Sequence, residues 1–351
     1  MPILNVDLHQ NSYPIIIEKG LLNGVNEEIK KFYDNGKIAI ITDKNIEKLY
    51  GHRIKKELEQ DFQIKLIVIE AGEKSKSLEV LHELYKELLD FQITRVDLII
   101  AFGGGVVGDL AGFAASTLLR GIPYVQIPTS LLAQIDSSVG GKVAINLDQG
   151  KNLVGSFYQP RAVLIDPELL SSLDERYFCD GMAEVIKYAC IGDRELFEAL
   201  LNYTKEELSQ NIEEIIFKSC KIKSDIVVKD EFDTGARMIL NFGHTLGHVI
   251  ERYYKYEKYS HGEAVAIGMY NMTKKSEEIG ISKEGTSNLI KKILSRYHLP
   301  YEMPPIEREE LIQGIGLDKK MKGQYINLLL LKEIGEVYIE RIHNKDISSY
   351  I

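Results

Sequence analysis

One segment constrains the fold of this chain more than any other: Asp97-Leu-Ile-Ile-Ala-Phe-Gly-Gly-Gly-Val-Val-Gly-Asp-Leu-Ala-Gly. Its apolar first part predicts a buried strand, and the glycines predict a tight turn that leads into a helix. Gly103, Gly105 and Gly108 satisfy the pattern Gly-x-Gly-x-x-Gly, in which backbone amides approach a pyrophosphate at the start of a helix. The pattern is weak by itself, so a dinucleotide site and a merely tight turn both remain open.

Short apolar runs alternate with amphipathic stretches through the first half of the chain. The runs predict strands at 13–17, 37–42, 64–69, 97–102 and 124–127, and the leucines of Leu78–Leu89 share one helical stripe. This alternation predicts a parallel sheet covered on both faces, with ligands bound beyond the carboxyl ends of its strands. Asp43, Glu73 and Lys76 follow predicted strands at such ends, although each taken alone fits a solvated loop better.

The glycine turn departs from the usual dinucleotide fingerprint in two ways. It follows the fourth predicted strand rather than the first, and no acidic residue stands about twenty positions further on. A carboxylate that binds a ribose would therefore come from elsewhere in the chain, and Asp43 is placed for that role.

The pattern changes after Pro167, where strand-like runs nearly vanish and helical patterns cover 181–256 and 262–297. A length of 351 residues fits two domains, and we place the boundary between 172 and 173. We therefore expect an α/β N-terminal domain with a Rossmann-like parallel sheet over 1–172 and a mainly α-helical C-terminal domain over 173–351. A late strand pair is expected at 324–331 and 337–341.

The formal net charge of −9 argues against a nucleic-acid or anionic-membrane partner, since both require a basic surface. A local cluster of Lys and Arg could still hold an anionic small molecule. Cys179, Cys190 and Cys220 cannot all pair with one another and show no Cys-x-x-Cys spacing, so we expect reduced thiols. We find neither a secretory signal nor an apolar run of the roughly 20 residues that a membrane helix needs, and we expect a cytoplasmic protein.

Three of the eight histidines, His244, His248 and His261, fall within eighteen residues. His244 and His248 are spaced i, i+4, which places both on one face of a helix. Together with a nearby carboxylate, such imidazoles would build a catalytic zinc-type site with an open position. The alternative is a pair of half-buried helix histidines and an unrelated loop histidine.

The segment 128–160 is too rich in Gly and Ser for a helix bundle and too apolar for a disordered linker. A loop-rich stretch of this length inside a compact domain is usually functional. Its candidate contacts are Asp136, Lys142, Lys151 and Asn152.

Five motifs occur in series along the chain: Gly-Gly-Gly-Val-Val-Gly-Asp, Asp-Ser-Ser-Val-Gly-Gly-Lys, Gly-Lys-Asn-Leu-Val-Gly-Ser-Phe-Tyr-Gln-Pro, Gly-Met-Ala-Glu-Val-Ile-Lys-Tyr and Gly-His-Thr-Leu-Gly-His. Together they resemble the 3-dehydroquinate synthases, shikimate-pathway enzymes of the sugar-phosphate cyclase superfamily. The resemblance runs from Asp43 to the Asp318-Lys319-Lys320 segment, in the family's order and at compatible spacings.

This resemblance implies one Zn²⁺ (or Co²⁺) ion, bound through Glu184, His244 and His261. Three protein ligands leave coordination positions for substrate oxygens. His248 matches a substrate-side residue near the phosphate, so the resemblance does not support the interpretation of both i, i+4 histidines as metal ligands. Lys187 follows Glu184 by one turn and is expected to face the same cleft between the domains.

The resemblance also implies a reaction, the conversion of 3-deoxy-D-arabino-heptulosonate 7-phosphate to 3-dehydroquinate and phosphate. In the family, NAD transiently oxidises the C5 hydroxyl, phosphate leaves by β-elimination, C5 is reduced again and an intramolecular aldol step closes the ring. NAD is regenerated in each turnover while the protein orients it.

Matched position by position, the family's functional residues fall into three groups. Those expected to contact NAD are Asp43, Glu73, Lys76, Gly104, Gly105, Asp109, Thr129, Ser130, Lys142 and Lys151. Those expected to hold the hydroxyls and carboxylate of the small sugar phosphate are Asp136, Lys142, Asn152 and Lys187. Those expected around the phosphate are Arg120, Lys223, Arg237, Asn241, His248 and Lys320, for which Lys319 is the alternative. The residue that matches Arg120 crosses a dimer interface in the family, so we expect a homodimer.

Three other functions are weighed against this one. A paralogous sugar-phosphate cyclase, such as an inosose or aminodehydroquinate synthase, would keep the zinc and NAD sites and change the substrate contacts. A metal-dependent polyol dehydrogenase of similar fold would release NADH and would not need a phosphate cluster. A catalytically inactive binding protein would not need the intact ligands that this chain retains.

Overall fold

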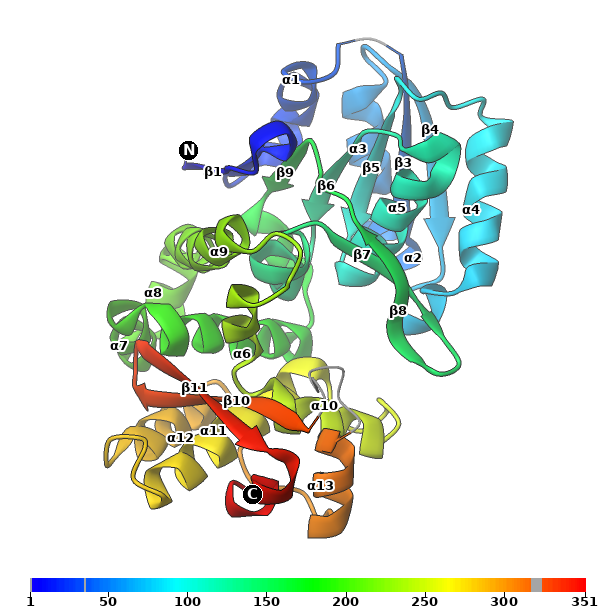
Figure 1. Ribbon diagram of the computed structural model, residues 1–351. Helices are drawn as coiled ribbons and strands as arrows, with labels where there is room; N and C mark the ends of the chain where they lie inside the picture. Colours follow the sequence, from blue (N-terminus) through cyan, green and yellow to red (C-terminus); the bar gives the residue numbers. More distant parts are fainter. Residues whose placement is uncertain (1, 35, 317–323) are drawn as a thin grey trace. The chain divides into compact units, whose positions relative to one another are not determined.

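The computed structural model describes residues 2–34, 36–316 and 324–351 (Figure 1). The chain forms two compact units, of which the first ends at Asp174 and the second runs from Glu175 to Ile351. The division thus lies between 174 and 175, whereas from the sequence we placed it between 172 and 173.

The first unit is built on a seven-stranded sheet with the order β1-β2-β9-β6-β5-β3-β4. β1 pairs antiparallel with β2, and the other neighbouring strands of this sheet are parallel, which confirms the expected architecture. The strands of the unit are β1 (Ile3–Val6), β2 (Tyr13–Ile17), β3 (Lys37–Asp43), β4 (Gln63–Ile69), β5 (Leu98–Gly103), β6 (Tyr124–Pro128), β7 (Lys142–Leu147), β8 (Gly150–Phe157) and β9 (Ala162–Ile165). Its helices are α1 (Val25–Lys30), α2 (Lys44–Ile46), α3 (His52–Leu58), α4 (Leu78–Asp90) and α5 (Gly105–Thr117).

Alternate side chains of the central strands enter two separate cores, because successive residues of a strand point to opposite faces. Along β3, Ala39 and Ile41 pack into the core that contains α4 and α5. Ile38 and Ile40 pack into the core that contains α1 and α3. Helices therefore cover both faces of the sheet, as Figure 1 shows.

The segment 128–160, which we expected to be rich in loops, contains an antiparallel hairpin of β7 and β8. Val143 and Ile145 of β7 are buried in the core beside α5, whereas β8 is largely exposed. The sequence pattern missed this hairpin because β8 is exposed on both faces over residues 152–155 and glycine interrupts its apolar residues, so no alternation of buried and exposed positions marks the strand.

The second unit is mainly helical, as expected, and carries a two-stranded antiparallel hairpin. Its helices are α6 (Glu175–Gly192), α7 (Arg194–Asn202), α8 (Lys205–Gln210), α9 (Ile212–Lys229), α10 (His244–Tyr253), α11 (His261–Glu278), α12 (Thr286–Arg296) and α13 (Arg308–Gly316), with the 3-10 turn η8 (Ala236–Asn241) before α10. The hairpin consists of β10 (Tyr325–Glu333) and β11 (Glu336–His343), where the late strand pair was expected. Ile326, Leu328 and Leu330 of β10 share a core with apolar residues of α10, α11 and α13.

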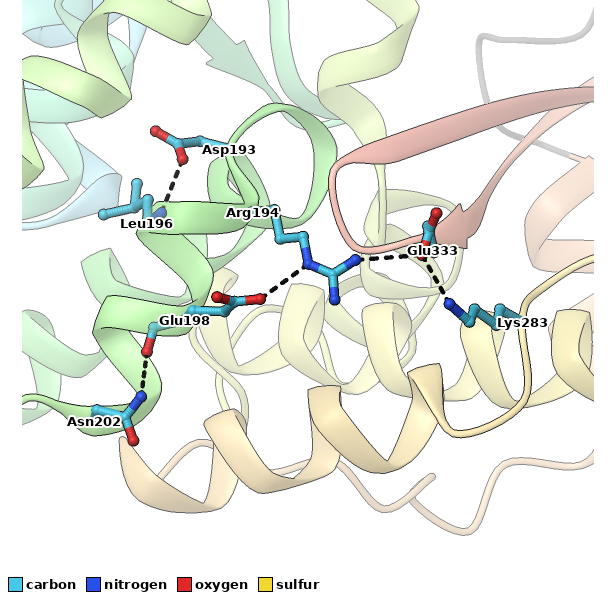
Figure 2. Close-up of polar contacts among 7 residues, drawn as sticks. All are labelled: Asp193, Arg194, Leu196, Glu198, Asn202, Lys283 and Glu333. Carbon is cyan, nitrogen blue, oxygen red and sulfur yellow. Dashed lines mark hydrogen bonds and ion pairs between the residues drawn. The ribbon is translucent and has the colours of Figure 1, made fainter.

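Charged side chains link α7 to the hairpin on the surface of the second unit (Figure 2). Asp193 caps α7 by accepting the backbone N–H of Leu196 at 2.8 Å. Arg194 donates to Glu198 at 2.9 Å and to Glu333 of β10 at 3.3 Å, as Figure 2 shows. Because these groups are exposed, each pair contributes only about 0–1 kcal/mol to stability.

Two further expectations concern the chain as a whole. Cys190 and Cys220 are buried and Cys179 is partly buried, and all three are free thiols. Among the described residues, none of the helices combines the length and apolar character that crossing a membrane requires.

Candidate functional site

Helix α6 places a carboxylate in the interior of the second unit. Glu184 is fully buried, and neither of its carboxylate oxygens has a hydrogen-bond partner among the described residues. Lys187, one turn further along α6 and 1% exposed, forms an ion pair with Oε2. A buried carboxylate is destabilising unless opposite charge or hydrogen bonds compensate it. Lys187 supplies a positive charge at Oε2, so Oε1 is the oxygen suited to a further cation.

His244 begins α10, and glycines set its position by letting α10 approach α11 closely. Gly243 precedes the helix with φ of 80°, in the left-handed region that favours glycine. A Cβ on Gly243 would lie 2.6 Å from Cγ of Met269, and a Cβ on Gly268 of α11 would overlap the Gly243 carbonyl. The small residues therefore bring the start of α10 against α11.

His261 begins α11, and two caps fix that end of the helix. Ser260 and Glu263 form a capping box, in which each side chain bonds to the other residue's backbone N–H. Asp180 of α6 accepts the backbone N–H of Gly262 at 2.5 Å. Because Asp180 lies one turn before Glu184, this bond ties His261 to the helix that carries the buried carboxylate.

The three side chains converge to form a candidate metal centre. One ligand atom from each of Glu184, His244 and His261 lies within 4.8 Å of the others. Nε2 of each histidine is 3.6 Å from Oε1 of Glu184. Zinc bonds of about 2.0–2.1 Å in tetrahedral geometry separate two ligand atoms by roughly 3.4 Å, so the group fits a divalent ion with little adjustment.

The other ring nitrogen of each histidine faces an acceptor. Nδ1 of His244 is 3.1 Å from the backbone carbonyl of Phe242, and Nδ1 of His261 is 3.3 Å from Oε2 of Glu251. Acceptors at these positions favour a proton on Nδ1 and leave Nε2 available for a metal. Burial lowers the pKa of His261, but the carboxylates of Glu184 and Glu251 outweigh it and raise that pKa well above its ordinary value. A cation at Nε2 would compete with this proton.

Glu251 is a residue of the site that the sequence analysis missed. It is 5% exposed and lies seven positions after His244 on α10, so the helical period puts both on one face. That spacing was the available signal, although a buried glutamate cannot be distinguished by periodicity from a surface one.

His248 lies beside the metal centre and outside the group of three ligands. Its ring centroid is 5.3 Å from that of His244 and 6.3 Å from that of His261. The structure therefore gives no support to a metal site made of the i, i+4 pair, because the group of converging ligand atoms contains His244 and does not contain His248.

Two buried cations lie on elements that pack against α6. Lys223 of α9 is 6% exposed and Arg237 of η8 is 3% exposed, and Asn241 ends η8. Asp230 shapes the loop before Arg237 by accepting the backbone N–H groups of Thr234, Gly235 and Arg237 at 2.7–3.0 Å. Burial raises the pKa of Asp230, but these bonds outweigh it and hold that pKa well below its usual range. Asp318, Lys319 and Lys320 lie outside the described residues.

The expected cofactor residues of the first unit gather at one edge of its sheet. Parallel pairing places Asp43 opposite Ile69, and Gly103 opposite Pro128, at the carboxyl ends of the strands. Thr129 follows β6 and donates its backbone N–H to the Gly103 carbonyl at 3.0 Å. Asp43 also caps α2 by accepting the backbone N–H of Asn45 and of Ile46, at 2.8 and 3.1 Å.

Lys76 is the centre of a polar network at this edge. Its side chain is 4% exposed, and Nζ donates to Oδ2 of Asp109 at 2.6 Å and to Oδ1 of Asn152 at 2.5 Å. Asn146 of β7 completes the network, since it donates to Oε1 of Glu73 at 2.7 Å and accepts the backbone N–H of Asn152 at 2.8 Å. Asn146 has no motif of its own and was not among the residues predicted from the sequence.

The glycines of the turn divide between two tasks. A Cβ on Gly108 would lie 2.7 Å from Oε1 of Gln126 on β6, so this glycine allows α5 to pack against the sheet. A Cβ on Gly104, the residue before α5, would meet only Ser130 Oγ at 3.6 Å. The backbone at Gly104 is therefore the part of the turn open to a ligand, whereas a Cβ on Gly105 would lie 3.0 Å from Oγ of Ser137.

The remaining candidates of the first unit lie at or near the surface. Lys142 and Asn152 of the hairpin are exposed, while Asp136, Lys151 and Ser130 are partly buried. Arg120 is exposed on the turn after α5, where its φ of 68° is left-handed.

Comparison with known proteins assigns the chain to a family. A model described as 3-dehydroquinate synthase N-terminal matches residues 66–180, and one described as 3-dehydroquinate synthase C-terminal matches residues 181–321. The 3-dehydroquinate synthase of Clostridium acetobutylicum is 52% identical over 353 residues, which cover 100% of this chain and 99% of that protein. The chain belongs to the 3-dehydroquinate synthase family. The family expected from the five motifs is thereby confirmed.

Solved structures of other cyclases share the fold. A 2-epi-5-epi-valiolone synthase from Streptomyces hygroscopicus, with NAD⁺ and Zn²⁺ bound, has a TM-score of 0.87 at 26% identity, covering 96% of this chain and 95% of its own. A 2-deoxy-scyllo-inosose synthase complexed with carbaglucose-6-phosphate, NAD⁺ and Co²⁺ has a TM-score of 0.86 at 23% identity, covering 99% and 98%. These likenesses confirm the expected fold class.

Proposed function

We propose that this chain is a 3-dehydroquinate synthase, which converts 3-deoxy-D-arabino-heptulosonate 7-phosphate to 3-dehydroquinate and phosphate as an NAD- and metal-dependent lyase. The observation that carries the proposal is a full-length relative of that function at 52% identity, in a chain whose Glu184, His244 and His261 converge as a metal centre. The inosose and valiolone synthases are only 23% and 26% identical, which favours the shikimate substrate over a paralogous cyclase.

The proposed metal ligands are Glu184, His244 and His261, holding Zn²⁺ or Co²⁺. The ion supplies Lewis-acid polarisation of a substrate oxygen when it is bound. Support comes from Oε1 of Glu184, a buried oxygen that has no hydrogen-bond partner among the described residues, and from the two Nε2 atoms that lie 3.6 Å from it. Lys187 stands beside the same carboxylate and, with Asp136, Lys142 and Asn152, is proposed to bind the substrate's hydroxyls and carboxylate.

The proposed NAD site is the carboxyl edge of the parallel sheet in the first unit. NAD supplies the acceptor and later the donor of the hydride when it is bound. The backbone amides at Gly104 and Gly105 would hold its pyrophosphate, and Asp43 is placed for a ribose hydroxyl. The other proposed contacts are Glu73, Lys76, Asp109, Thr129, Ser130, Lys142 and Lys151.

The proposed phosphate-binding residues are mostly cationic. Lys223 and Arg237 are buried, and charge-assisted hydrogen bonds to phosphate are strong in such surroundings. His248 lies beside the metal centre, where its ring could exchange a proton with a substrate oxygen. The other members of the group are Arg120, Asn241 and Lys320. A homodimer, to which Arg120 would contribute across the interface, and a cytoplasmic location are part of the same proposal.

The test is a turnover assay on purified protein supplied with NAD⁺, Zn²⁺ and the heptulosonate phosphate, with the product identified. We expect stoichiometric phosphate release and no net accumulation of NADH. Steady accumulation of NADH would contradict the proposal and indicate a dehydrogenase. His261→Ala should lose metal and activity, whereas the matched control His82→Ala, on the exposed face of α4, should retain both.

A further inference from the structure

Glu251 occupies the same face of α10 as the proposed metal ligand His244. The two residues are separated by seven positions, or nearly two helical turns, and both are buried. A carboxylate in the interior is destabilising unless hydrogen bonds or opposite charge compensate it. Its burial at this place therefore requires a partner in the site.

The ring of His261 is one such partner. Nδ1 of His261 lies 3.3 Å from Oε2 of Glu251, whereas Nε2 of the same ring lies 3.6 Å from Oε1 of Glu184. The two nitrogens thus face two different carboxylates, which come from α10 and α6. The carboxylate at Nε2 belongs to the proposed ligand set, so the carboxylate at Nδ1 is left to orient the ring.

His244 offers an internal comparison. Its Nδ1 faces the carbonyl of Phe242 at 3.1 Å, a neutral acceptor supplied by the backbone. A carboxylate is a stronger acceptor than a carbonyl, and it also raises the basicity of the nitrogen that binds the metal. His261 is the more exposed of the two ligands, with 31% of its side chain accessible against 10% for His244, so it depends more on such support.

We propose that Glu251 is a positioning residue for the metal centre: it holds the proton of His261 on Nδ1 and so presents Nε2 to the ion. This inference rests on the proposed function, because it assumes that Glu184, His244 and His261 bind a metal. The inference adds Glu251 to the proposed site as a residue that acts on the metal ion through His261 and does not contact the ion itself.

The test compares Glu251→Gln and Glu251→Ala with a matched control, Glu263→Gln. Glu263 lies in the first turn of α11, as His261 does, but its carboxylate faces Arg176 and the backbone of Ser260. A glutamine at this position can still complete the capping box. The Zn²⁺ dissociation constant of each metal-stripped protein is measured by competition with a chromophoric chelator. The visible spectrum of the Co²⁺-loaded protein and the urea midpoint of the metal-free protein are recorded in parallel.

We expect Glu251→Ala to weaken Zn²⁺ binding roughly 10- to 100-fold, Glu251→Gln to lie between it and the unmodified protein, and Glu263→Gln to stay within about twofold. The Co²⁺ spectrum should change in the Glu251 variants alone, while their metal-free urea midpoints stay close to that of the unmodified protein. Zn²⁺ binding unchanged in both Glu251 variants would overturn the inference and leave the proposed function intact. An unmodified protein that fails to bind Zn²⁺ would overturn both.

Discussion

Gly262 and Asp180 hold the first turn of α11 against α6. The backbone N–H of Gly262 donates to Oδ1 of Asp180 at 2.5 Å, and a Cβ on Gly262 would overlap the Asp180 backbone carbonyl. The contact fixes His261, the preceding residue, relative to Glu184, which follows Asp180 by one turn. The geometry of the candidate metal centre therefore depends on a position that carries no side chain.

Gly262→Ala should displace His261 from the metal centre. Because the overlap is with backbone, α11 must shift, and we expect a cost of about 1–3 kcal/mol in the free energy of unfolding. Zn²⁺ affinity should fall roughly tenfold or more, since one of the three proposed ligands is moved. Urea unfolding and chelator competition measure the two effects. Gly24→Ala, where a Cβ meets nothing within 4 Å, is the control, and an equal response of both variants would contradict this prediction.

Gly104→Ala and Gly108→Ala should separate cofactor binding from packing. In Gly104→Ala, the Cβ would meet only Ser130 Oγ at 3.6 Å, so we expect a stability loss below about 1 kcal/mol. Its NAD⁺ affinity should fall roughly tenfold, or about 1.4 kcal/mol, because the added methyl group would stand where the proposed site receives the pyrophosphate. In Gly108→Ala, the Cβ would lie 2.7 Å from Gln126 Oε1, so we expect mainly a loss of stability, by about 1–3 kcal/mol. Calorimetric NAD⁺ titration measures the affinity, and urea unfolding measures the stability. The reverse pattern would contradict the assignment of the glycine turn to the proposed NAD site.

Asn146→Ala should weaken NAD⁺ binding although Asn146 belongs to none of the family motifs. Its side chain orients Glu73 and the backbone of Asn152, so its loss frees two residues of the proposed site. Each such hydrogen bond contributes about 0.5–1.5 kcal/mol, and we expect a roughly three- to tenfold higher dissociation constant by calorimetric titration. Asn202→Ala, whose amide bonds only to the Glu198 carbonyl of its own helix in the described contacts, should leave binding unchanged. Unaltered affinity in Asn146→Ala would show that the network does not order the site.

Asp230→Asn should alter how stability depends on pH. The folded-state pKa of Asp230 is depressed, so its carboxylate stabilises the fold above the ordinary value of 3.8, and this stability is lost as pH falls through 3.8 toward the lower folded value. At neutral pH we expect the variant to be about 1–3 kcal/mol less stable, since three backbone N–H groups lose a charged acceptor.

The measurement is the urea midpoint of metal-free protein between pH 6 and pH 3, because chelation removes the separate effect of acid on metal ligands. The midpoint of Asp230→Asn should fall less over this range than that of the unmodified protein. Asp225→Asn, on the exposed face of α9, is the control and should follow the unmodified profile. Parallel profiles for all three proteins would rule out this role for Asp230.

Local patterns in the sequence determined the parallel sheet, the shared helix face of two histidines and the family. Short continuous apolar runs, separated by amphipathic stretches, predicted the parallel sheet, because successive residues of a strand that enter two cores must both be apolar, as Ile40 and Ile41 are. The spacing of His244 and His248 predicted a shared helix face, and the order of the five motifs identified the family and pointed to Glu184 and His261. The hairpin β7–β8 was missed, because most side chains of β8 are exposed and leave no periodic signal.

Tertiary structure alone decided which polar groups meet. Lys76 bonds to Asn152 across 76 positions of sequence, and Gly262 bonds to Asp180 across 82. Spacing along one helix cannot distinguish the buried Glu251 from a solvated glutamate, because burial depends on the helix that packs against it. The physical reason is that a charge partner is selected by distance in space, whereas a sequence pattern records only the direction in which each side chain leaves its own backbone.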